Sequence, residues 1–496
     1  MSRVQGVRVL LGVSTVVAAL ALAGCGGDEA AVGGAAADVV PANVALYVSS
    51  NTDFEGEEWQ QAEELVRKFP DGDRAIRELL ATIEEEDVDF EEDVKPAFGP
   101  EVAVVVLDFA GDDPQFVGLT QPRDQQKFDE LIAQGDEPAV SEEFEGWTVF
   151  SDEQASIDAF KQAAGGDTLA DSDAYTEAVA GLDEGLVTVY VSGAGLQRAA
   201  EQNPTFDPAS LETVLPNGEF PTMGITVGAD DDGGRLDGQF VFGGDLEESG
   251  FVGEPFSAEL PDELPGEVFA YVGFNNLEQQ ISRFRDVLAD VDPNFESQLG
   301  QIEGALGVSL EEDIAPLFAG EGAFYVRRGS PLPELTLVTR VENDEQAVGT
   351  VDDLVEGLVG ADVSLPPPED TEIAGVQARQ LVLEPPVTLF YAAFDGLLVL
   401  TTARDGIADL REEGDRLSDD ESFTDALDQA GVPDETTGIV YVNLAEAVPL
   451  LLDYVDASGE SVPPEVRANT EPLQNFVAFG TAEGDTVTFS AFLGVE

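Results

Sequence analysis

The sequence predicts an α+β protein built from two tandem homologous domains, each a mostly antiparallel sheet with helices packed on one face. Three observations predict this fold. Four segments recur in the same order in the two halves, hairpins alternate with helix-like stretches, and 43% of the 496 residues are hydrophobic. Because a single core stops growing near the size of each half, two domains are expected.

The internal repeat is carried by four pairs of segments. They are Pro41–Val48 with Pro265–Val272, Val88–Phe98 with Val308–Phe318, Leu169–Ala178 with Leu417–Ala426, and Gly185–Val191 with Gly438–Leu444. Their shared order predicts a first repeat over residues 39–255 and a second over 256–496. The second half also holds an extra segment near Ile373 to Tyr391, which predicts an added strand or hairpin.

The first repeat begins with a strand and alternates hairpins with helices. Apolar runs predict strands over residues 44–49, 102–108, 115–120, 147–150, 186–191, 223–228 and 236–242. Apolar residues at helical spacing predict helices over residues 59–69, 74–86, 125–133, 155–163 and 175–180. Asn51, Thr52 and Asp53 are suited to cap the first of these helices. This order of elements favours a largely antiparallel sheet.

Residues 1–24 are expected to be a lipoprotein signal peptide. Arg3 and Arg8 precede a short apolar stretch that ends in Leu-Ala-Gly-Cys25, which is similar to the bacterial lipoprotein processing box. The alternative is a plain signal peptide or short anchor, with Cys25 there by chance. Lipidation of Cys25 would anchor the protein to the outer face of a bacterial membrane, since two acyl chains hold stably where one does not. Residues 25–38, rich in Gly and Ala, predict a flexible tether.

The composition excludes several classes of activity. The chain has 101 Asp and Glu against 22 Lys and Arg, a formal charge of −79, with no His and one Cys. This excludes His-based acid–base catalysis, Ser-His-Asp and Cys-His nucleophiles, Cys/His zinc sites and internal disulfides. Nucleic acid would be repelled, and no motif calls for a cofactor. The charge predicts a solvated, self-repelling surface, with a collection of calcium sites as the alternative.

Two motifs carry a resemblance to a known family. Pro-x-x-Val-x-x-Tyr-Val opens both repeats, and Glu-Glu-Asp-(Val/Ile)-x-Pro-x-Phe precedes a strand in both. Together with the export signal, these residues resemble the bacterial envelope proteins catalogued as domain of unknown function thirty-three fifty-two. The resemblance covers the chain from about Asp38 onward. It implies an exported, membrane-associated protein without established chemistry, so no functional residue is carried over from it.

Acidic residues supply the candidate catalytic and metal-binding groups. Glu101 and Glu321, at the starts of equivalent strands, are the candidate catalytic carboxylates, and a glycosidase pair would need them to face each other within about 5–10 Å. The simpler interpretation is a solvated acid at each strand entrance. Asp230, Asp232 and Asp237 resemble part of a calcium loop and are the candidate metal ligands, although a hairpin turn also explains them.

A basic pair and four tyrosines complete the candidates. Arg327 and Arg328 predict either a partner or anion contact, or an ion pair with a neighbouring acidic loop. Four tyrosines end apolar strands and are expected in the core, with a glycan or lipid cleft as the alternative. They are Tyr47, Tyr190, Tyr271 and Tyr441.

These observations favour a non-enzymatic binding or scaffold module that a lipid anchors in the envelope. Its default ligand site is the groove between the two domains, because clefts at domain interfaces commonly bind ligands. The expected ligand is a glycan, lipid or protein of the envelope, with divalent cations only as minor partners. A carboxylate-dependent glycan hydrolase and an acidic cation-binding surface protein are the alternatives.

Overall fold

The computed structural model describes residues 34–496, except for residues 82–87, 110–114, 134–138, 203–214, 216–217, 245, 247–251, 293, 331, 361–365, 384–386, 413 and 460. The expected signal peptide, Cys25 and most of the tether therefore lie outside the described residues. The chain divides into two compact units. Unit 1 comprises Met1–Gly244, Tyr454–Gln474 and Asp485–Glu496, and unit 2 comprises Asp245–Asp453 and Asn475–Gly484. The units differ from the two sequence repeats because C-terminal residues of the second repeat belong to unit 1.

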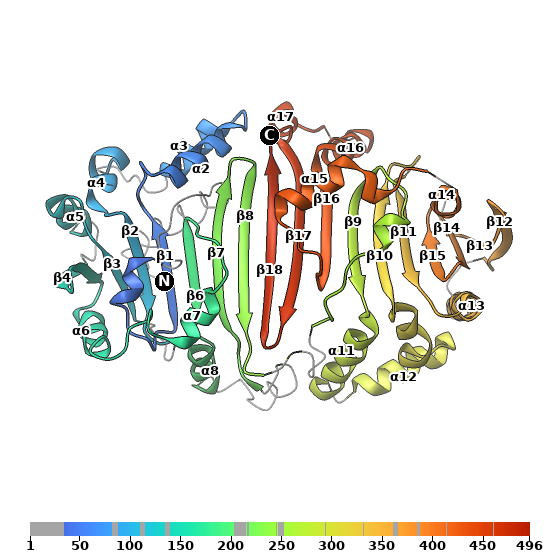
Figure 1. Ribbon diagram of the computed structural model, residues 1–496, viewed down its shortest axis with the longest axis horizontal. Coiled ribbons are helices and arrows are strands. Elements are labelled where there is room, and N and C mark those ends of the chain that lie inside the picture. The colour runs from blue at the N-terminus through green and yellow to red at the C-terminus, as the bar shows by residue number, and fades with distance from the viewer. Residues whose placement is uncertain are drawn as a thin grey trace. The chain divides into compact units, whose positions relative to one another are not determined.

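The sheet of unit 1 is antiparallel at every described pairing (Figure 1). Its strands, in spatial order, are β4 (Val140–Phe144), β5 (Trp147–Ser151), β3 (Phe116–Thr120), β2 (Glu101–Val106), β1 (Leu46–Asn51), β6 (Val187–Val191), β7 (Thr222–Asp230), β8 (Gly233–Val241) and β18 (Thr486–Val495). Strand β1 pairs with β2 on one side and with β6 on the other.

The helices of unit 1 pack on both faces of this sheet, so the prediction of helices on one face is wrong here. They are η2 (Ala35–Asp38), α2 (Glu57–Arg67), α3 (Gly72–Leu80), η3 (Phe90–Val94), α4 (Lys95–Ala97), α5 (Gln125–Ile132), α6 (Gln154–Ala163), α7 (Asp173–Val179), α8 (Gly193–Gln202) and α17 (Pro464–Thr470). One apolar cluster joins α6 and α7 to Ala103 of β2, and another joins α2, α4 and α5 to the adjacent Val102. Adjacent residues of a strand point to opposite faces. The uninterrupted apolar sequence of β2 is typical of a strand buried on both sides.

Unit 2 also contains an antiparallel sheet. Its strands, in spatial order, are β17 (Leu473–Glu483), β16 (Gly438–Asn443), β9 (Val268–Asn275), β10 (Glu321–Arg327), β11 (Glu334–Arg340), β15 (Leu397–Thr401), β14 (Thr388–Phe394), β13 (Val376–Val382) and β12 (Glu369–Ile373). Strand β9 lies between β10 and β16, as β1 lies between β2 and β6. The expected extra hairpin is present as β12 and β13, which begin before Ile373 and end well before Tyr391, earlier than the expected segment.

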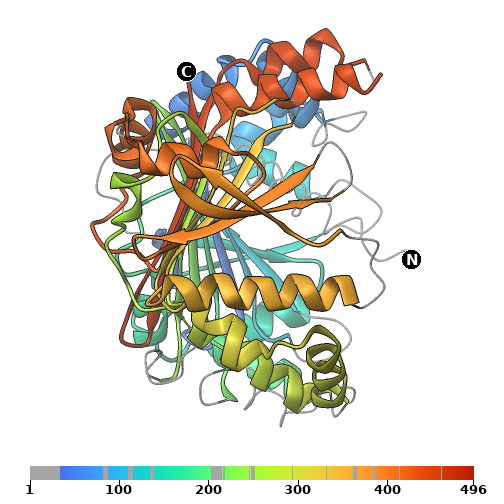
Figure 2. The same cartoon turned by 90° about the vertical axis from the view of Figure 1, so that its right-hand side faces the viewer.

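The helices of unit 2 follow the same order along the chain as those of unit 1. They are η5 (Leu260–Asp262), α11 (Leu277–Val291), α12 (Phe295–Leu306), η6 (Leu310–Ile314), η7 (Ala315–Phe318), α13 (Asp344–Gly360), α14 (Asp405–Arg411), η8 (Leu417–Asp419), α15 (Glu421–Ala430) and α16 (Leu444–Ala457), the last of which ends in unit 1. In Figure 2 the olive α11 and α12 lie beneath the gold α13. None of the described helices is long and apolar enough to cross a membrane.

The same aromatic arrangement forms the core of each unit. In unit 1, Tyr175 makes edge-to-face contacts with Tyr47 and Tyr190. In unit 2, Phe423 makes the equivalent contacts with Tyr271 and Tyr441. All four of the tyrosines that the sequence placed in the core are buried. Such ring pairs stabilise a core beyond the apolar area they bury.

Candidate functional site

Glu101, the first candidate carboxylate, is buried at the start of β2 and holds a helix N-terminus in place. Its carboxylate accepts hydrogen bonds from the backbone N–H of Ala35 at 2.8 Å, the Ser49 hydroxyl at 2.7 Å and the Tyr47 hydroxyl at 3.2 Å. Ala35 begins η2, whose first N–H groups have no partner within the helix. Burial raises the pKa of Glu101, while these hydrogen bonds act to lower it.

Glu321 has the same role in unit 2. Its carboxylate accepts from the backbone N–H groups of Glu259 and Leu260, both at 2.8 Å, where η5 begins. Arg340 donates from Nε to its other oxygen at 3.3 Å. Both acids are buried, so the expectation of solvated acids at strand entrances is wrong. In each unit the carboxylate therefore binds backbone N–H groups where a short helix begins.

The acidic turn of unit 1 does not gather its carboxylates around one point. Asp230 accepts from the backbone N–H of Asp232 at 3.1 Å, which is a local turn contact. Asp237 lies on β8, opposite Ser490 of β18, and accepts from that hydroxyl at 2.6 Å. The hairpin interpretation of these residues therefore agrees with the structure. Across the described residues, no group of three or more Asp, Glu, His or Cys is placed to hold a metal ion.

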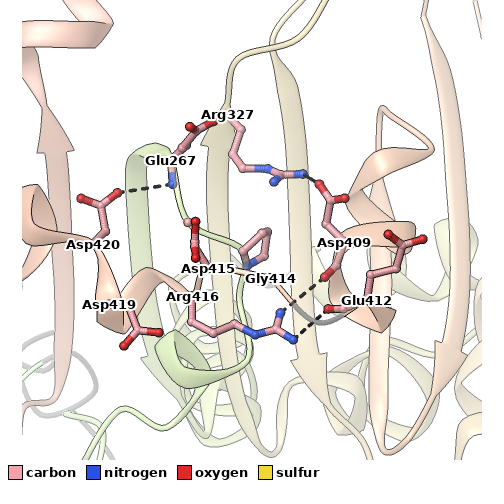
Figure 3. A pocket seen from close by; sticks show the side chains of 11 residues that line it. Glu267, Arg327, Asp409, Glu412, Gly414, Asp415, Arg416, Asp419 and Asp420 are labelled. Carbon is pink, nitrogen blue, oxygen red and sulfur yellow. Dashed lines mark hydrogen bonds and ion pairs between the residues drawn. The ribbon is translucent and has the colours of Figure 1, made fainter.

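A cavity of about 510 Å³ in unit 2 is the candidate functional site (Figure 3). Its walls come from the segment before β9, the end of β10 and the segment from α14 to the start of α15. The lining residues are Pro265, Gly266, Glu267, Arg327, Asp409, Glu412, Gly414, Asp415, Arg416, Asp419 and Asp420. Six of these side chains are carboxylates and two are guanidinium groups. The cavity is thus strongly polar and carries an excess of negative charge.

Arg416 fixes one wall of the cavity through backbone contacts. Its guanidinium donates to the carbonyl oxygens of Glu263 at 2.9 Å and Glu412 at 3.0 Å. Asp420 accepts from the backbone N–H of Glu267 at 3.3 Å and caps α15 through the N–H of Ser422 at 2.9 Å. These contacts tie together segments that are far apart in the sequence and give the cavity a defined shape.

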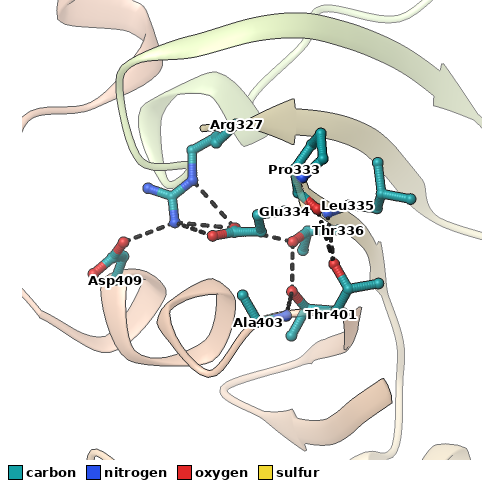
Figure 4. Close-up of polar contacts among 9 residues, drawn as sticks. Arg327, Pro333, Glu334, Leu335, Thr336, Thr401, Ala403 and Asp409 are labelled. Atoms are coloured by element: carbon teal, nitrogen blue, oxygen red, sulfur yellow. Dashed lines mark hydrogen bonds and ion pairs between the residues drawn. The ribbon is translucent and has the colours of Figure 1, made fainter. Parts of the chain in front are cut away.

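Arg327 forms a buried ion pair in the opposite wall (Figure 4). It lies on β10 opposite Glu334 of β11, and its Nη2 is 3.0 and 2.9 Å from the two carboxylate oxygens. The same nitrogen donates to Asp409 of α14 at 2.7 Å. The side chains of Arg327 and Glu334 are 12% and 4% exposed. The ion-pair interpretation of Arg327 is therefore confirmed, but its partners lie on a strand and a helix rather than on an acidic loop.

Arg328 behaves differently from its neighbour. Its side chain is 73% exposed, and its guanidinium is 3.9 Å from the carboxylate of Glu446. At that exposure an ion pair contributes little to stability. The basic pair is thus divided between a buried structural group and an exposed cation.

The ion pair continues into a buried polar network. The Thr336 hydroxyl donates to Glu334 at 3.1 Å and is 2.8 Å from the hydroxyl of Thr401 (Figure 4). Burial raises the pKa of Glu334, although Arg327 and Thr336 counteract it. Buried polar groups are tolerated when each one has partners, and this network provides them.

The first repeat has apolar residues at two positions of this network. Arg327 follows Glu321 at the same sequence distance as Leu107 follows Glu101. Thr339 lies opposite Gly322 and Thr120 lies opposite Val102, so the two threonines occupy equivalent positions. Thr336 and Val117 each precede these threonines by three residues and are therefore equivalent as well. Val117 is fully buried in an apolar cluster, and Leu107 packs against that cluster. Glu334, opposite Arg327, corresponds in the same way to the polar Gln115, opposite Leu107. The second repeat has therefore replaced the apolar Leu107 and Val117 with an arginine and a threonine beside a cavity.

Comparison with known families identifies the family of this chain. The sequence model of a family described as a protein of unknown function, DUF3352, matches residues 125–476. The chain belongs to this family. The resemblance seen in the sequence is thereby confirmed, over a shorter stretch than the one expected from Asp38 onward. The DUF3352 match includes every residue that lines the cavity, whereas Glu101 lies outside it. No curated protein matches the chain.

The sequence alone did not predict the cavity. Only Arg327 was singled out, because a basic residue is unusual in so acidic a chain. The other lining residues belong to separate segments whose acids resemble the many solvated acids elsewhere. A signal was nonetheless present in the repeat, where Arg327 takes the place of Leu107.

Proposed function

We propose that this member of DUF3352 is an exported, lipid-anchored binding protein, and that the cavity in unit 2 takes a ligand carrying a positively charged group. The observation that carries the proposal is the buried Arg327, which binds Glu334 and Asp409 beside a carboxylate-rimmed cavity at a position where the first repeat has the apolar Leu107. A charged group is costly to bury where an apolar residue would fit. Its presence beside a cavity favours a role in ligand binding.

The charge of the cavity selects the class of ligand. Both lining guanidinium groups already bind protein oxygens, so the remaining carboxylates set the potential. An organic ammonium group gains from those carboxylates, whereas an anion would be repelled. With neither imidazole nor thiol in the exported body, the proposed role is to hold the ligand rather than to transform it.

Export and anchoring rest on the N-terminal sequence. The Leu-Ala-Gly-Cys25 ending and the acidic body favour an acyl anchor, because a surface so negative would not bind anionic lipid. Replacement of the acylation site, Cys25→Ser, is expected to abolish labelling of the protein by radioactive palmitate. Continued labelling of that variant would contradict lipidation at Cys25.

Calorimetry with spermidine tests the cavity. We expect saturable binding at low salt, and magnesium chloride at equal ionic strength is expected not to reproduce it. Glu412 and Asp415 are exposed on the rim, so Glu412→Gln and Asp415→Asn should each weaken binding about fivefold, as for one charge contact in water.

The matched control is Asp425→Asn, which removes an exposed carboxylate of α15 outside the cavity. This variant should bind spermidine as the unaltered protein does. Equal weakening by all three substitutions would assign the binding to the general surface charge and refute the cavity as the site.

A further inference from the structure

The sheet of unit 2 has one apolar face that the described residues leave partly open. Along five neighbouring strands, nine apolar side chains of one face are half-buried or exposed, whereas Thr339 and Leu398 at one end of that face are buried. The open face consists of Ala270, Val272, Phe324, Val326, Leu335, Leu337, Leu400, Val440 and Val442. Phe324 and Leu335 are 37% and 43% exposed. We name this set of nine residues the apolar face.

The strand registers make the apolar face continuous. Phe324 lies opposite Leu337 on one side and Val272 on the other, and Val326 lies opposite Leu335. Leu337 in turn lies opposite Leu400, and Val272 lies opposite Val440. Directly opposite residues have Cβ atoms about 5 Å apart, so their side chains touch.

The corresponding face of unit 1 is covered by its own helices. There Trp59 and Ala62 of α2 and Phe90 of η3 pack in one cluster with Val102 and Val187. In unit 2, α13 packs with Leu398 and Leu400 and covers one side of this face. The rest stays open, because α11, which follows β9 as α2 follows β1, has no buried side chain among those described, and its Phe284 is 64% exposed. Large apolar patches left open on a folded protein mark a binding surface.

A cationic residue stands at one end of the apolar face. Arg328 follows Val326 by two residues just beyond the end of β10, and its side chain is 73% exposed and lies 3.9 Å from the exposed carboxylate of Glu446. An uncharged apolar surface that ends at a cation complements an amphiphile with a hydrocarbon chain and an anionic head. In a chain with a formal charge of −79, this charge is opposite to that of most of the surface.

We propose that the apolar face of unit 2 binds one acyl chain and that Arg328 binds its anionic head group. The five strands span four inter-strand steps of about 4.8 Å, which is about 19 Å. One acyl chain covers about 15 Å, half of the ~30 Å bilayer core, and therefore fits across the face. The site is separate from the cavity of unit 2 and does not depend on a ligand there.

Two other occupants suit this surface less well. A second copy of this chain would bring its own large negative charge against the first. An added peptide strand would need unpaired backbone groups, but the backbones of β9, β10 and β11 are already paired on both sides. A hydrocarbon chain carries no charge and needs no unpaired backbone groups, and apolar burial alone stabilises its binding.

Photocrosslinking of the full-length protein in its own membrane tests the proposal. The probe is a fatty acid with a diazirine in its chain, and crosslinked peptides are mapped by mass spectrometry. We expect crosslinks on β10 and β11. Because Phe324 and Leu335 are the most exposed members of the apolar face, the double variant Phe324→Ser/Leu335→Ser should lower their yield about tenfold.

The matched control is Val466→Ser, in unit 1, where the side chain is 43% exposed and lies outside the apolar face. It should leave the yield unchanged. Arg328→Gln should lower the yield with the fatty acid but not with the corresponding fatty alcohol. Absence of crosslinks on β10 and β11, or equal yields for the double variant and the control, would overturn the proposal. A change of oligomeric state in the double variant with unaltered crosslinking would overturn it in favour of contact between copies.

Discussion

Replacing Arg327 by Leu, the residue at the equivalent position of the first repeat, tests the buried network. The substitution removes three hydrogen bonds to Glu334, at 3.2, 3.0 and 2.9 Å, and one to Asp409 at 2.7 Å. Glu334 is then a buried carboxylate whose remaining partner is the hydroxyl of Thr336. Removing one partner of a buried ion pair costs about 3–5 kcal/mol, and we expect the free energy of unfolding of unit 2 to fall by this amount at pH 7.

The loss should depend on pH with a definite sign. Burial raises the pKa of Glu334, and Arg327 opposes that rise, so the pKa rises further in the variant. The folded variant then binds a proton more tightly than its unfolded chain. Its stability is greatest below the ordinary Glu pKa of about 4.3 and falls as the pH rises through the folded pKa. The deficit relative to the unaltered protein should therefore be smaller at pH 5 than at pH 7.

Urea unfolding followed by far-ultraviolet circular dichroism measures this effect. Tryptophan fluorescence serves as the internal reference, because Trp59 and Trp147 both lie in unit 1. The double variant Arg327→Leu/Glu334→Gln places the residues of the first repeat at both positions and should recover stability to within about 1 kcal/mol of the unaltered protein. A single variant as stable as the unaltered protein, or a deficit that grows toward pH 5, would refute the reasoning.

Two further predictions concern unit 1 and the whole chain. Glu101→Gln should destabilise unit 1 by about 1–3 kcal/mol at pH 7, because the new amide nitrogen faces the donor groups of Ala35 and Ser49. A urea unfolding transition within experimental error of that of the unaltered protein would contradict this. Because burial raises the pKa of Glu101, its ionisation lowers the free energy of unfolding of the unaltered protein as the pH rises above about 4.3. The Glu101→Gln variant should not show this decline. The melting temperature of the protein should rise as sodium chloride increases from about 0.01 M, where charges interact over about 30 Å, and a flat response would argue against dense surface repulsion.

Most of the secondary structure could be predicted from local patterns. The strand expected over residues 102–108 is β2, and the helix expected over residues 155–163 is α6. An added hairpin was also expected, although β12 begins at Glu369, before the segment that the sequence indicated. These features depend on residues close together in the chain, so short apolar patterns are sufficient to predict them.

The roles of the candidate residues were harder to predict. Glu101 has the appearance of a solvated acid in sequence, but η2 and Ser49 surround its carboxylate in the fold. The division of the basic pair into a buried Arg327 and an exposed Arg328 depends on β11 and α14. Such partners lie many residues away, and the local sequence does not identify them.

The amino-acid sequence by itself determined the charge, the missing imidazole, the internal repeat and the kinds of chemistry open to the chain, because these depend only on which residues are present and in what order. Only the tertiary structure decided which carboxylates are buried, where the cavity lies and which sheet face stays open. Burial is a property of packing between distant segments. Two repeats with similar strands therefore differ in their surfaces through the helices that happen to cover them.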